Sequence, residues 1–227
     1  EDFNNGLTVL SRLTDGKVFV CGADTNLPVN SQTNVEHFDV IIVGAGISGL
    51  GSAYHLKSQS PEKSFCVLDG MESYGGTWLI HNYPGIRSDS DLFTFGYRFK
   101  PWTGKPIASG AEIMNYLGEV ISENELGPHI RYNHHVMNAN WCNKTQLWTI
   151  SAFNKLTQQT STFTANFLWM CQGYYQHEKG YIPKWPGMDD YQGEVVHPQN
   201  WPEDLNYNDK NVVVIGSGAT AATLVPN

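Results

Sequence analysis

Three glycines after an apolar run offer the first chemistry in this sequence. Gly44, Gly46 and Gly49 form a Gly-x-Gly-x-x-Gly pattern between the run Val40–Val43 and a segment with apolar residues at helical spacing. In a strand–turn–helix unit, such glycines permit a tight turn, close approach of the backbone to a pyrophosphate, and close packing of the helix on the strand. The free N–H groups of the first helical turn, which contains Ser48, would bind the phosphates. We therefore predict a dinucleotide site at this turn.

An acidic residue stands where such a site needs one. Asp69 directly follows a second apolar run, Ser64–Leu68, and comes twenty residues after Gly49. Its carboxylate would accept hydrogen bonds from both ribose hydroxyls of the adenosine half. The alternative is a βαβ unit that binds no nucleotide, but the strand, the helix and the acid together favour the dinucleotide site.

A second glycine-rich turn lies far along the chain. Gly216 and Gly218, followed by Thr220 and Ala221, form a Gly-x-Gly-x-x-Ala pattern after Asn211–Ile215, which we expect to be a strand. Taken alone, this pattern fits an ordinary turn as well as a dinucleotide site. Two such turns in one chain favour two dinucleotides, a flavin and a nicotinamide.

Two denser patterns lie between the turns. The first consists of Gly75, Gly76, Thr77, Trp78, Tyr83, Pro84, Gly85 and Asp89. The second is an aromatic-x-Gly-x3-His-x3-Trp-Pro fingerprint made of Tyr191, Gly193, His197, Trp201 and Pro202. Together they resemble the patterns of the class B flavoprotein monooxygenases, and specifically of their Baeyer–Villiger branch. The segments 83–91 and 216–220 are most similar to the ethionamide-activating monooxygenase subgroup.

The resemblance covers about residues 37–226 and departs from the family pattern at two sites. Tyr191 stands where the fingerprint usually has Phe, which is a mild change. Asp69 stands in place of the more usual Glu, and Gly70 and Met71 replace basic residues. The contact with the adenosine ribose would therefore be shorter and less charged than is usual in the family.

The resemblance implies an α/β protein with two Rossmann-like domains that bind FAD and NADPH, the second of them truncated. Residues 1–36 would be an N-terminal extension of unknown role, and 37–173 the N-terminal part of the FAD-binding domain. Residues 174–209 would be a linker that carries the fingerprint. Residues 210–227 would begin the NADPH-binding domain.

The resemblance also assigns roles to individual residues. FAD would be bound by Gly44, Gly46, Ser48, Gly49, Asp69, Gly76, Thr77, Trp78, Tyr83 and Asp89. NADPH would be bound by Gly216, Gly218, Thr220 and Ala221. The implied catalytic residues are Asp89, His197 and Trp201. Asp89 would lie near the flavin and orient an arginine located beyond residue 227, whereas His197 would lie on the hinge between the domains.

The implied reaction consumes NADPH and O2. NADPH would reduce FAD, the reduced flavin would form a C4a-peroxide, and one oxygen atom would be inserted beside the carbonyl of a small ketone. Oxygenation of a sulfur-containing substrate would be a secondary activity. Closure of the domains about the linker would keep water away from the flavin.

Three other functions remain open. One is a related flavin-containing monooxygenase that oxygenates nitrogen and sulfur, although such enzymes usually lack the Trp-Pro ending of the fingerprint. Another is a flavin-dependent disulfide reductase or NADH oxidase, which needs a redox-active cysteine, whereas Cys66 lies inside a predicted strand and Cys171 ends another. The third is a FAD-binding fragment without turnover.

Several site residues also have simpler interpretations. An isolated Trp78 or Trp201 is more often a core aromatic than a site residue. His197 could be a hydrogen-bonded linker histidine, and Asp89 alone would be a turn residue. Only their fit to the family pattern favours the functional interpretation.

The hydrophobic pattern predicts the elements that position these residues. Val40–Val43 and Ser64–Leu68 are typical of strands buried in a parallel sheet. Ser109 and Glu112 have the spacing of a capping box, which predicts a helix with an apolar face made of Ile113, Tyr116, Leu117 and Val120. Alternating residues predict further strands over His135–Trp141, Leu147–Phe153 and Thr160–Phe167, the last running into Leu168–Cys171. Near the N-terminus, Asp15-Gly16 predicts a hairpin between Leu7–Leu13 and Lys17–Cys21.

The composition excludes several classes of protein. Only 16% of the 227 residues are charged, which is too few for a disordered chain. The net charge of −8 argues against a nucleic-acid partner, and no apolar run reaches the ~20 residues of a membrane-spanning helix. The start has no signal-peptide pattern, and the chain stops one turn into a helical pattern, so we expect a fragment of a longer protein.

Cysteine and histidine usage points to a compartment and argues against a metal. The four cysteines, Cys21, Cys66, Cys142 and Cys171, form no CxxC pair, which favours a reducing compartment such as the cytoplasm. His134 and His135, like Asp89 and Asp91, have no further ligands at metal-binding spacing, so we predict no metal site. The sequence does not indicate an oligomeric state.

Overall fold

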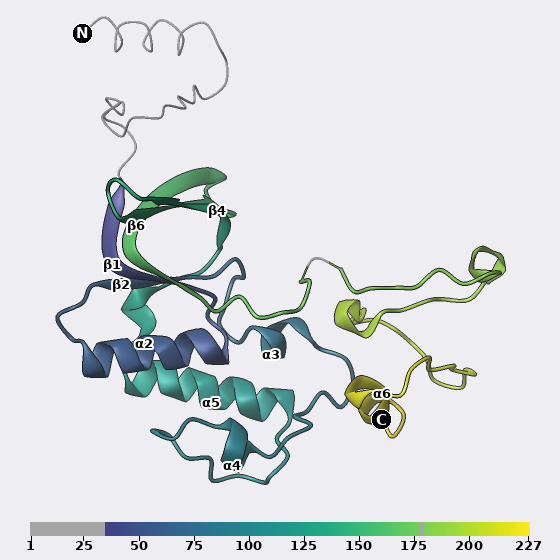
Figure 1. The fold of residues 1–227 in the computed structure, drawn as a ribbon. Helices are drawn as coiled ribbons and strands as arrows, with labels where there is room; N and C mark the ends of the chain where they lie inside the picture. The colour runs from purple at the N-terminus through teal and green to yellow at the C-terminus, as the bar shows by residue number, and fades with distance from the viewer. Residues whose placement is uncertain (1–34, 178) are drawn as a thin grey trace, which may run out of the picture.

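The computed structural model describes residues 35–177 and 179–227. They form one mixed parallel and antiparallel β-sheet, with helices on one face, and a long C-terminal extension (Figure 1). The hairpin that we predict between Leu7–Leu13 and Lys17–Cys21 lies outside the described residues. The predicted α/β class is confirmed, because parallel strands alternate with helices in the first half of the chain.

The sheet has six strands in the order β3-β2-β1-β6-β5-β4. β1 (Glu36–Val43) pairs in parallel with β2 (Phe65–Leu68) and β6 (Gln159–Met170), and β2 pairs in parallel with β3 (Ile130–Arg131). β4 (His134–Cys142), β5 (Leu147–Asn154) and β6 form an antiparallel meander. The sequence predicts each of these strands except β3, and β6 continues as one strand through both predicted segments.

Alternating residues on β1 separate two hydrophobic cores. Val40 and Ile42 face the helices, where they belong to a core with residues of α2 (Ile47–Gln59) and α5 (Gly110–Glu123). Ile41 and Val43 face the opposite side and pack against Ile150, Ala152, Phe163 and Ala165 of the meander. β1 is therefore covered on both faces, which explains its uninterrupted apolar run.

α5 begins directly after the N-cap residue that the sequence predicts. Glu112 Oε2 accepts a hydrogen bond of 2.8 Å from the Ser109 N–H, and Ser109 Oγ accepts one of 3.3 Å from the Glu112 N–H, so the predicted capping box is confirmed. Short helices follow the two loops that matter for the site, α3 (Thr77–Ile80) and α4 (Leu92–Phe95). Among the helices of the described residues, none has both the length and the apolar character that crossing a bilayer requires.

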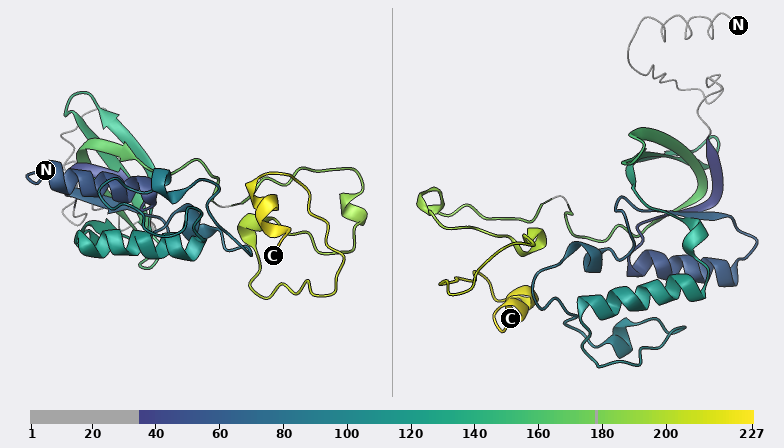
Figure 2. Two further views of the ribbon diagram at one scale, coloured as in Figure 1. Left: turned by 90° about the horizontal axis from the view of Figure 1, so that it is seen from below. Right: turned by 180° about the vertical axis from the view of Figure 1, so that it is seen from behind.

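The segment after β6 extends away from the body formed by the sheet, α2 and α5, as both views in Figure 2 show. It contains three short helical elements, η2 (Met188–Asp190), η3 (Pro198–Asn200) and α6 (Ala219–Leu224). The strand that we predict over 211–215 is wrong for this chain, since these residues are extended but unpaired, and Val213 is 83% exposed. A strand needs a neighbour for its backbone groups, and the described residues offer this segment none.

An ion pair joins Arg131 of β3 to Glu36 of β1. Both guanidinium nitrogens of Arg131 donate to the two carboxylate oxygens of Glu36 at 2.6 Å, and the guanidinium lies over the rings of Phe38 and Phe163. The hydrogen bonds and positive charge of Arg131 lower the pKa of the Glu36 carboxyl, although burial opposes them. Because this pKa is lower in the folded than in the unfolded state, the ion pair stabilises the fold fully at pH values above the unfolded-state pKa. This contribution is lost as the pH falls through the folded-state pKa.

Replacing this carboxylate should therefore have a pH-dependent cost. We expect Glu36→Gln to lower the free energy of unfolding at neutral pH by about 1 kcal/mol, a value limited by the partial exposure of the pair. The difference from wild type should shrink as the pH falls below about 4.3, the ordinary pKa of glutamate, and should vanish only below the lowered folded-state pKa. Denaturant titrations across this range test it, with the exposed Glu62→Gln as the matched control. A cost that does not depend on pH would contradict the assignment.

Candidate functional site

The predicted strand–turn–helix unit is present at the carboxyl end of β1. The N–H of Gly44 donates a hydrogen bond of 2.8 Å to the carbonyl of Leu68 at the end of β2, and Gly44 has a φ of +107°. A Cβ at Gly49 would lie 1.8 Å from the carbonyl oxygen of Gly44. The first turn of α2 therefore lies directly on the backbone of the glycine turn, which no residue with a side chain permits.

The end of β6 closes this turn from the other side. The Cys171 N–H donates to the Val43 carbonyl at 2.8 Å, and a Cβ at Gly44 would lie 2.4 Å from the Cys171 carbonyl oxygen. Segments that follow β1, β2 and β6 thus meet at one point. This is the edge of a parallel sheet at which nucleotides bind in doubly wound folds.

A second glycine-rich loop, which leads into α3, faces the turn. The Gly75 N–H donates to the Ala45 carbonyl at 3.0 Å. A Cβ at Gly46 would lie 3.5 Å from Gly76 Cα, and one at Gly76 would lie 3.1 Å from Gly46 Cα. Gly46, the N-cap of α2, provides no side-chain cap for the helix. The N–H groups of the first turn are thus available to an anion, and the atoms nearest to a Cβ at Gly46 belong to the backbone of Gly76.

Asp69 is placed beside the glycine turn and is nearly buried, with 8% of its surface exposed. Its Oδ2 accepts a hydrogen bond of 2.6 Å from the Ala45 N–H, and its Oδ1 accepts one of 2.7 Å from the Met71 N–H. Both oxygens of this carboxylate therefore accept hydrogen bonds from backbone N–H groups, a structural role for Asp69 that its spacing did not predict. Asp69 connects the glycine turn to the loop after β2.

Asp89 lies in a different place, next to α6. It lines a cavity of about 390 Å³ together with Arg87, Ser88, Ile107, Ala219, Ala222 and Thr223. Its own carboxylate accepts a hydrogen bond of 3.2 Å from the Ser90 hydroxyl. The cavity lies between the loop that follows α3 and the helix that follows the second glycine turn. The sequence analysis did not single out Arg87, although its position two residues before Asp89 on an exposed loop was a usable signal.

The other residues of the first dense pattern surround the same loop. Tyr83 is 6% exposed, and its hydroxyl lies 3.5 Å from that of Thr220 on α6. Thr77 begins α3, and its carbonyl accepts a hydrogen bond of 2.9 Å from the His81 ring. Trp78 packs edge-to-face on Phe95 and against the helix-side core, so the simpler interpretation of Trp78 as a packing residue describes its surroundings.

The fingerprint residues His197 and Trp201 pack within the segment 174–209. His197 Nδ1 accepts a hydrogen bond of 3.2 Å from the Gln199 N–H as the N-cap of η3, and its ring lies against Gly180. Trp201 packs edge-to-face on Tyr207. Neither residue lines the cavity that contains Asp89. The structure therefore does not bring together the three residues predicted as catalytic, since His197 and Trp201 pack within residues 174–209 and do not line the cavity of Asp89.

The second glycine turn is open. Gly216 has a φ of +131°, and a Cβ at Gly216 or Gly218 would meet nothing within 4 Å. Thr220 and Ala221 lie in the first turn of α6 and are partly buried. The turn has the backbone shape of a dinucleotide turn, but the sheet that would pack against it is not among the described residues.

The three described cysteines are free thiols. Burial raises the pKa of Cys66 to about 11 and also raises the pKa of Cys171. Both groups are therefore poor thiolates, which is unfavourable for a disulfide reductase. The pKa of Cys142 is lowered, mainly by a hydrogen bond from the Thr145 hydroxyl, but Cys142 lies at the β4–β5 hairpin.

Comparison with known proteins places this site in a family. A model described as "flavin-binding monooxygenase-like" matches residues 107–226, and one described as "NAD(P)-binding Rossmann-like domain" matches residues 42–101. The FAD-containing monooxygenase EthA of Mycolicibacterium smegmatis is 52% identical over 193 residues, which are 85% of this chain and 39% of that protein. The probable FAD-binding monooxygenase AlmA of an Acinetobacter species is 50% identical over 83% of this chain and 38% of that protein. The chain thus spans about two-fifths of the length of these curated relatives.

Solved structures show the same relationship. A steroid monooxygenase bound to NADP has a TM-score of 0.70 at 28% identity and covers 84% of this chain and 36% of its own. A cyclohexanone monooxygenase variant from Rhodococcus sp. Phi1 bound to NADP+ has a TM-score of 0.72 at 26% identity, with the same coverage of both chains. The resemblance predicted from the motifs is thereby confirmed. This chain belongs to the flavin-binding monooxygenase-like family.

Proposed function

We propose that this chain is the cofactor-binding portion of a flavin-dependent monooxygenase, with FAD at the Gly44–Gly49 turn and NADPH at the Gly216–Ala221 turn. One observation carries the proposal: the uncapped first turn of α2 opens beside the facing backbones of Gly46 and Gly76. A pyrophosphate needs free N–H groups and an approach without side chains, and this place offers both. Two comparisons support this proposal. The relative EthA is an FAD-containing monooxygenase, and the similar steroid monooxygenase structure is bound to NADP.

Asp69 would then have two tasks. An ionised carboxylate has about four acceptor positions, so its two backbone hydrogen bonds leave capacity for the ribose hydroxyls. Ser48, in the first turn of α2, and Thr77, at the start of α3, would border the phosphates and the flavin. Trp78 and Tyr83 would line the flavin from the loop side.

The proposed domain boundaries follow the same division. Residues 37–173 would bind FAD, 174–209 would be the hinge-bearing linker, and 210–227 would begin the NADPH-binding domain. His197 and Trp201 would act on this hinge, since they pack within the linker. Closure about the hinge would exclude water from the cavity that Asp89 lines.

The proposed reaction inserts one oxygen atom of O2 beside a ketone carbonyl, with S-oxygenation as a secondary activity. When bound, FAD supplies the hydride acceptor for NADPH and the centre that activates O2. Asp89 would orient the guanidinium of an arginine beyond residue 227 through a charge-assisted hydrogen bond. A similar solved structure is a cyclohexanone monooxygenase, which is named for a ketone and so agrees with a ketone substrate.

The experiment uses the full-length form, meaning the chain extended to the length of its curated relatives. Purified enzyme with NADPH and O2 is incubated with an aliphatic ketone and with an aryl methyl sulfide. We expect ester and a smaller amount of sulfoxide, and faster flavin reduction by NADPH than by NADH. Asp89→Ala should reduce ester formation by at least about tenfold, as removal of a charge-assisted contact would, whereas the exposed linker variant Asp189→Ala should not. Sulfoxide without ester would assign the protein to the enzymes that oxygenate nitrogen and sulfur.

A further inference from the structure

A tyrosine from the α4–α5 loop holds the first turn of α2. The hydroxyl of Tyr97 donates a hydrogen bond to the carbonyl oxygen of Ile47, the first residue of the helix. Its ring lies against the helix backbone one turn later, where a Cβ at Gly51 would lie 2.9 Å from Tyr97 Cε1. Both contacts are made at the end of α2 that faces the glycine turn.

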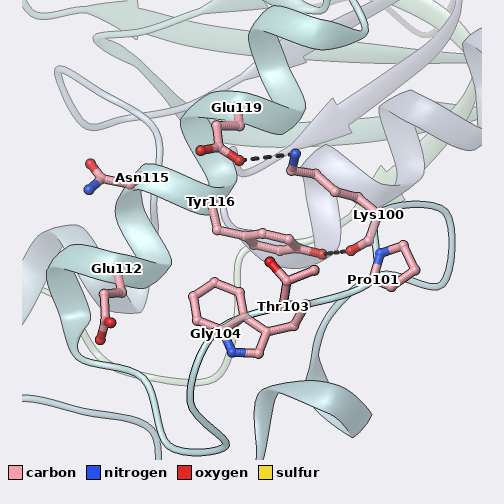
Figure 3. A pocket seen from close by; sticks show the side chains of 9 residues that line it. Lys100, Pro101, Thr103, Gly104, Glu112, Asn115, Tyr116 and Glu119 are labelled. Atoms are coloured by element: carbon pink, nitrogen blue, oxygen red, sulfur yellow. Dashed lines mark hydrogen bonds and ion pairs between the residues drawn. The ribbon is translucent and has the colours of Figure 1, made fainter.

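Tyr97 is itself fixed from behind. Its N–H donates a hydrogen bond of 2.8 Å to the hydroxyl of Tyr116 on α5. Figure 3 shows that this hydroxyl in turn donates a hydrogen bond, of 2.6 Å, to the Lys100 carbonyl. Tyr116 and Lys100 are walls of a cavity of about 290 Å³ that contains none of the predicted site residues. Ion pairs of 3.0 Å and 2.7 Å connect the Lys100 ammonium to Glu119 and Glu123 on α5.

An aromatic stack supports the ring of Tyr97. Its centroid lies 4.7 Å from that of Phe99, which in turn stacks on Tyr54 of α2 at 3.5 Å. Burial raises the pKa of the Tyr97 hydroxyl, so it remains protonated and able to donate throughout the pH range in which the protein is studied. The stack and the hydrogen bonds together hold the Tyr97 hydroxyl against the Ile47 carbonyl.

We propose that Tyr97 is a positioning residue for the FAD pyrophosphate. The peptide unit is planar, so a hydrogen bond that fixes the carbonyl of Ile47 also fixes the N–H of Ser48 on the other side of the same plane. That N–H is one of the unpaired donors of the first helical turn, which the proposed function assigns to the phosphates. A donor at the carbonyl also polarises the peptide and strengthens its N–H as a donor.

The test is a pair of matched Tyr→Phe variants in the full-length form. Tyr97→Phe removes the hydroxyl and keeps the ring, whereas Tyr54→Phe removes a hydroxyl from the same stack that makes no hydrogen bond to the described residues. The dissociation constant of FAD, measured by flavin fluorescence titration of the FAD-free protein, should rise about fivefold to tenfold for Tyr97→Phe, the worth of one hydrogen bond. It should change less than about twofold for Tyr54→Phe.

Two further measurements separate positioning from general stability. Amide hydrogen exchange in the FAD-free Tyr97→Phe protein should accelerate in the first turn of α2 and stay unchanged in the middle of α5. The thermal midpoint of the FAD-free protein is recorded alongside. A lowered midpoint with an unchanged FAD affinity, or equal affinities in the two variants, would overturn the inference. The inference rests on the proposed function, and the two fail differently: wild-type protein that binds no FAD would refute the function itself.

Discussion

Replacing Gly49 with alanine is expected to prevent the glycine turn from forming and to destabilise the full-length form by about 3 kcal/mol or more. The added Cβ would lie 1.8 Å from the Gly44 carbonyl oxygen, a distance only slightly longer than a covalent bond. Gly44 cannot move away, because it lies against the Cys171 carbonyl oxygen on its other side: a Cβ built at Gly44 would be 2.4 Å from that oxygen. Relief therefore requires α2 to separate from both β1 and β6, with loss of their shared core.

The measurement is the free energy of unfolding from denaturant titration. Gly127→Ala is the matched control, because a Cβ there would meet nothing within 4 Å and the residue has no positive φ. We expect the control to change stability by less than about 1 kcal/mol. If Gly49→Ala is as stable as the control, the contact between α2 and the turn is not as described.

Gly46→Val is expected to abolish FAD binding while leaving the protein folded. A Cβ at Gly46 would lie 3.5 Å from Gly76 Cα, an ordinary contact, so the backbone need not move. The two methyl groups of valine would instead extend into the approach to the first turn of α2, where the proposed function places the pyrophosphate. A hundredfold or greater rise in the FAD dissociation constant, about 2.7 kcal/mol, is the expected effect.

Flavin absorbance per mole of purified full-length protein measures this effect directly. Gly46→Ala is the matched control, since it adds only the tolerated Cβ and should keep most of the flavin. Unfolding curves of both variants should remain close to that of wild type. Normal flavin stoichiometry in Gly46→Val would remove the glycine turn from the cofactor site, whereas an unfolded variant would show that Gly46 acts on the fold.

Much of the fold follows from local patterns in the sequence. The apolar run Val40–Val43 predicts a strand covered on both faces, and both cores include residues of β1. The capping box at Ser109 and the apolar face of α5 are confirmed residue by residue. These features depend on neighbours within one or two turns, and such neighbours are visible in the sequence.

One expectation failed and another was incomplete, for reasons that are not local. The run 211–215 has the composition of a buried strand, yet it is unpaired, because a strand forms only where a neighbouring strand completes its hydrogen bonds. Asp69 is predicted to bind the ribose hydroxyls, and its spacing did not indicate that both of its oxygens also accept hydrogen bonds from the backbone N–H groups of Ala45 and Met71. Neither outcome can be read from spacing, since each depends on which segment lies beside the residue.

The sequence by itself determined that a strand, a glycine turn and a helix follow one another at Val40–Leu50, and which family motifs accompany them. Only the tertiary structure decided what meets that turn: the end of β6 at Gly44, the loop of Gly76 at Gly46, and Tyr97 at the first turn of α2. It also decided that His197 and Trp201 pack within residues 174–209 while Asp89 lies beside α6. The physical reason is that spacing along the chain determines local conformation, whereas contacts between distant segments follow from the order of strands in the sheet.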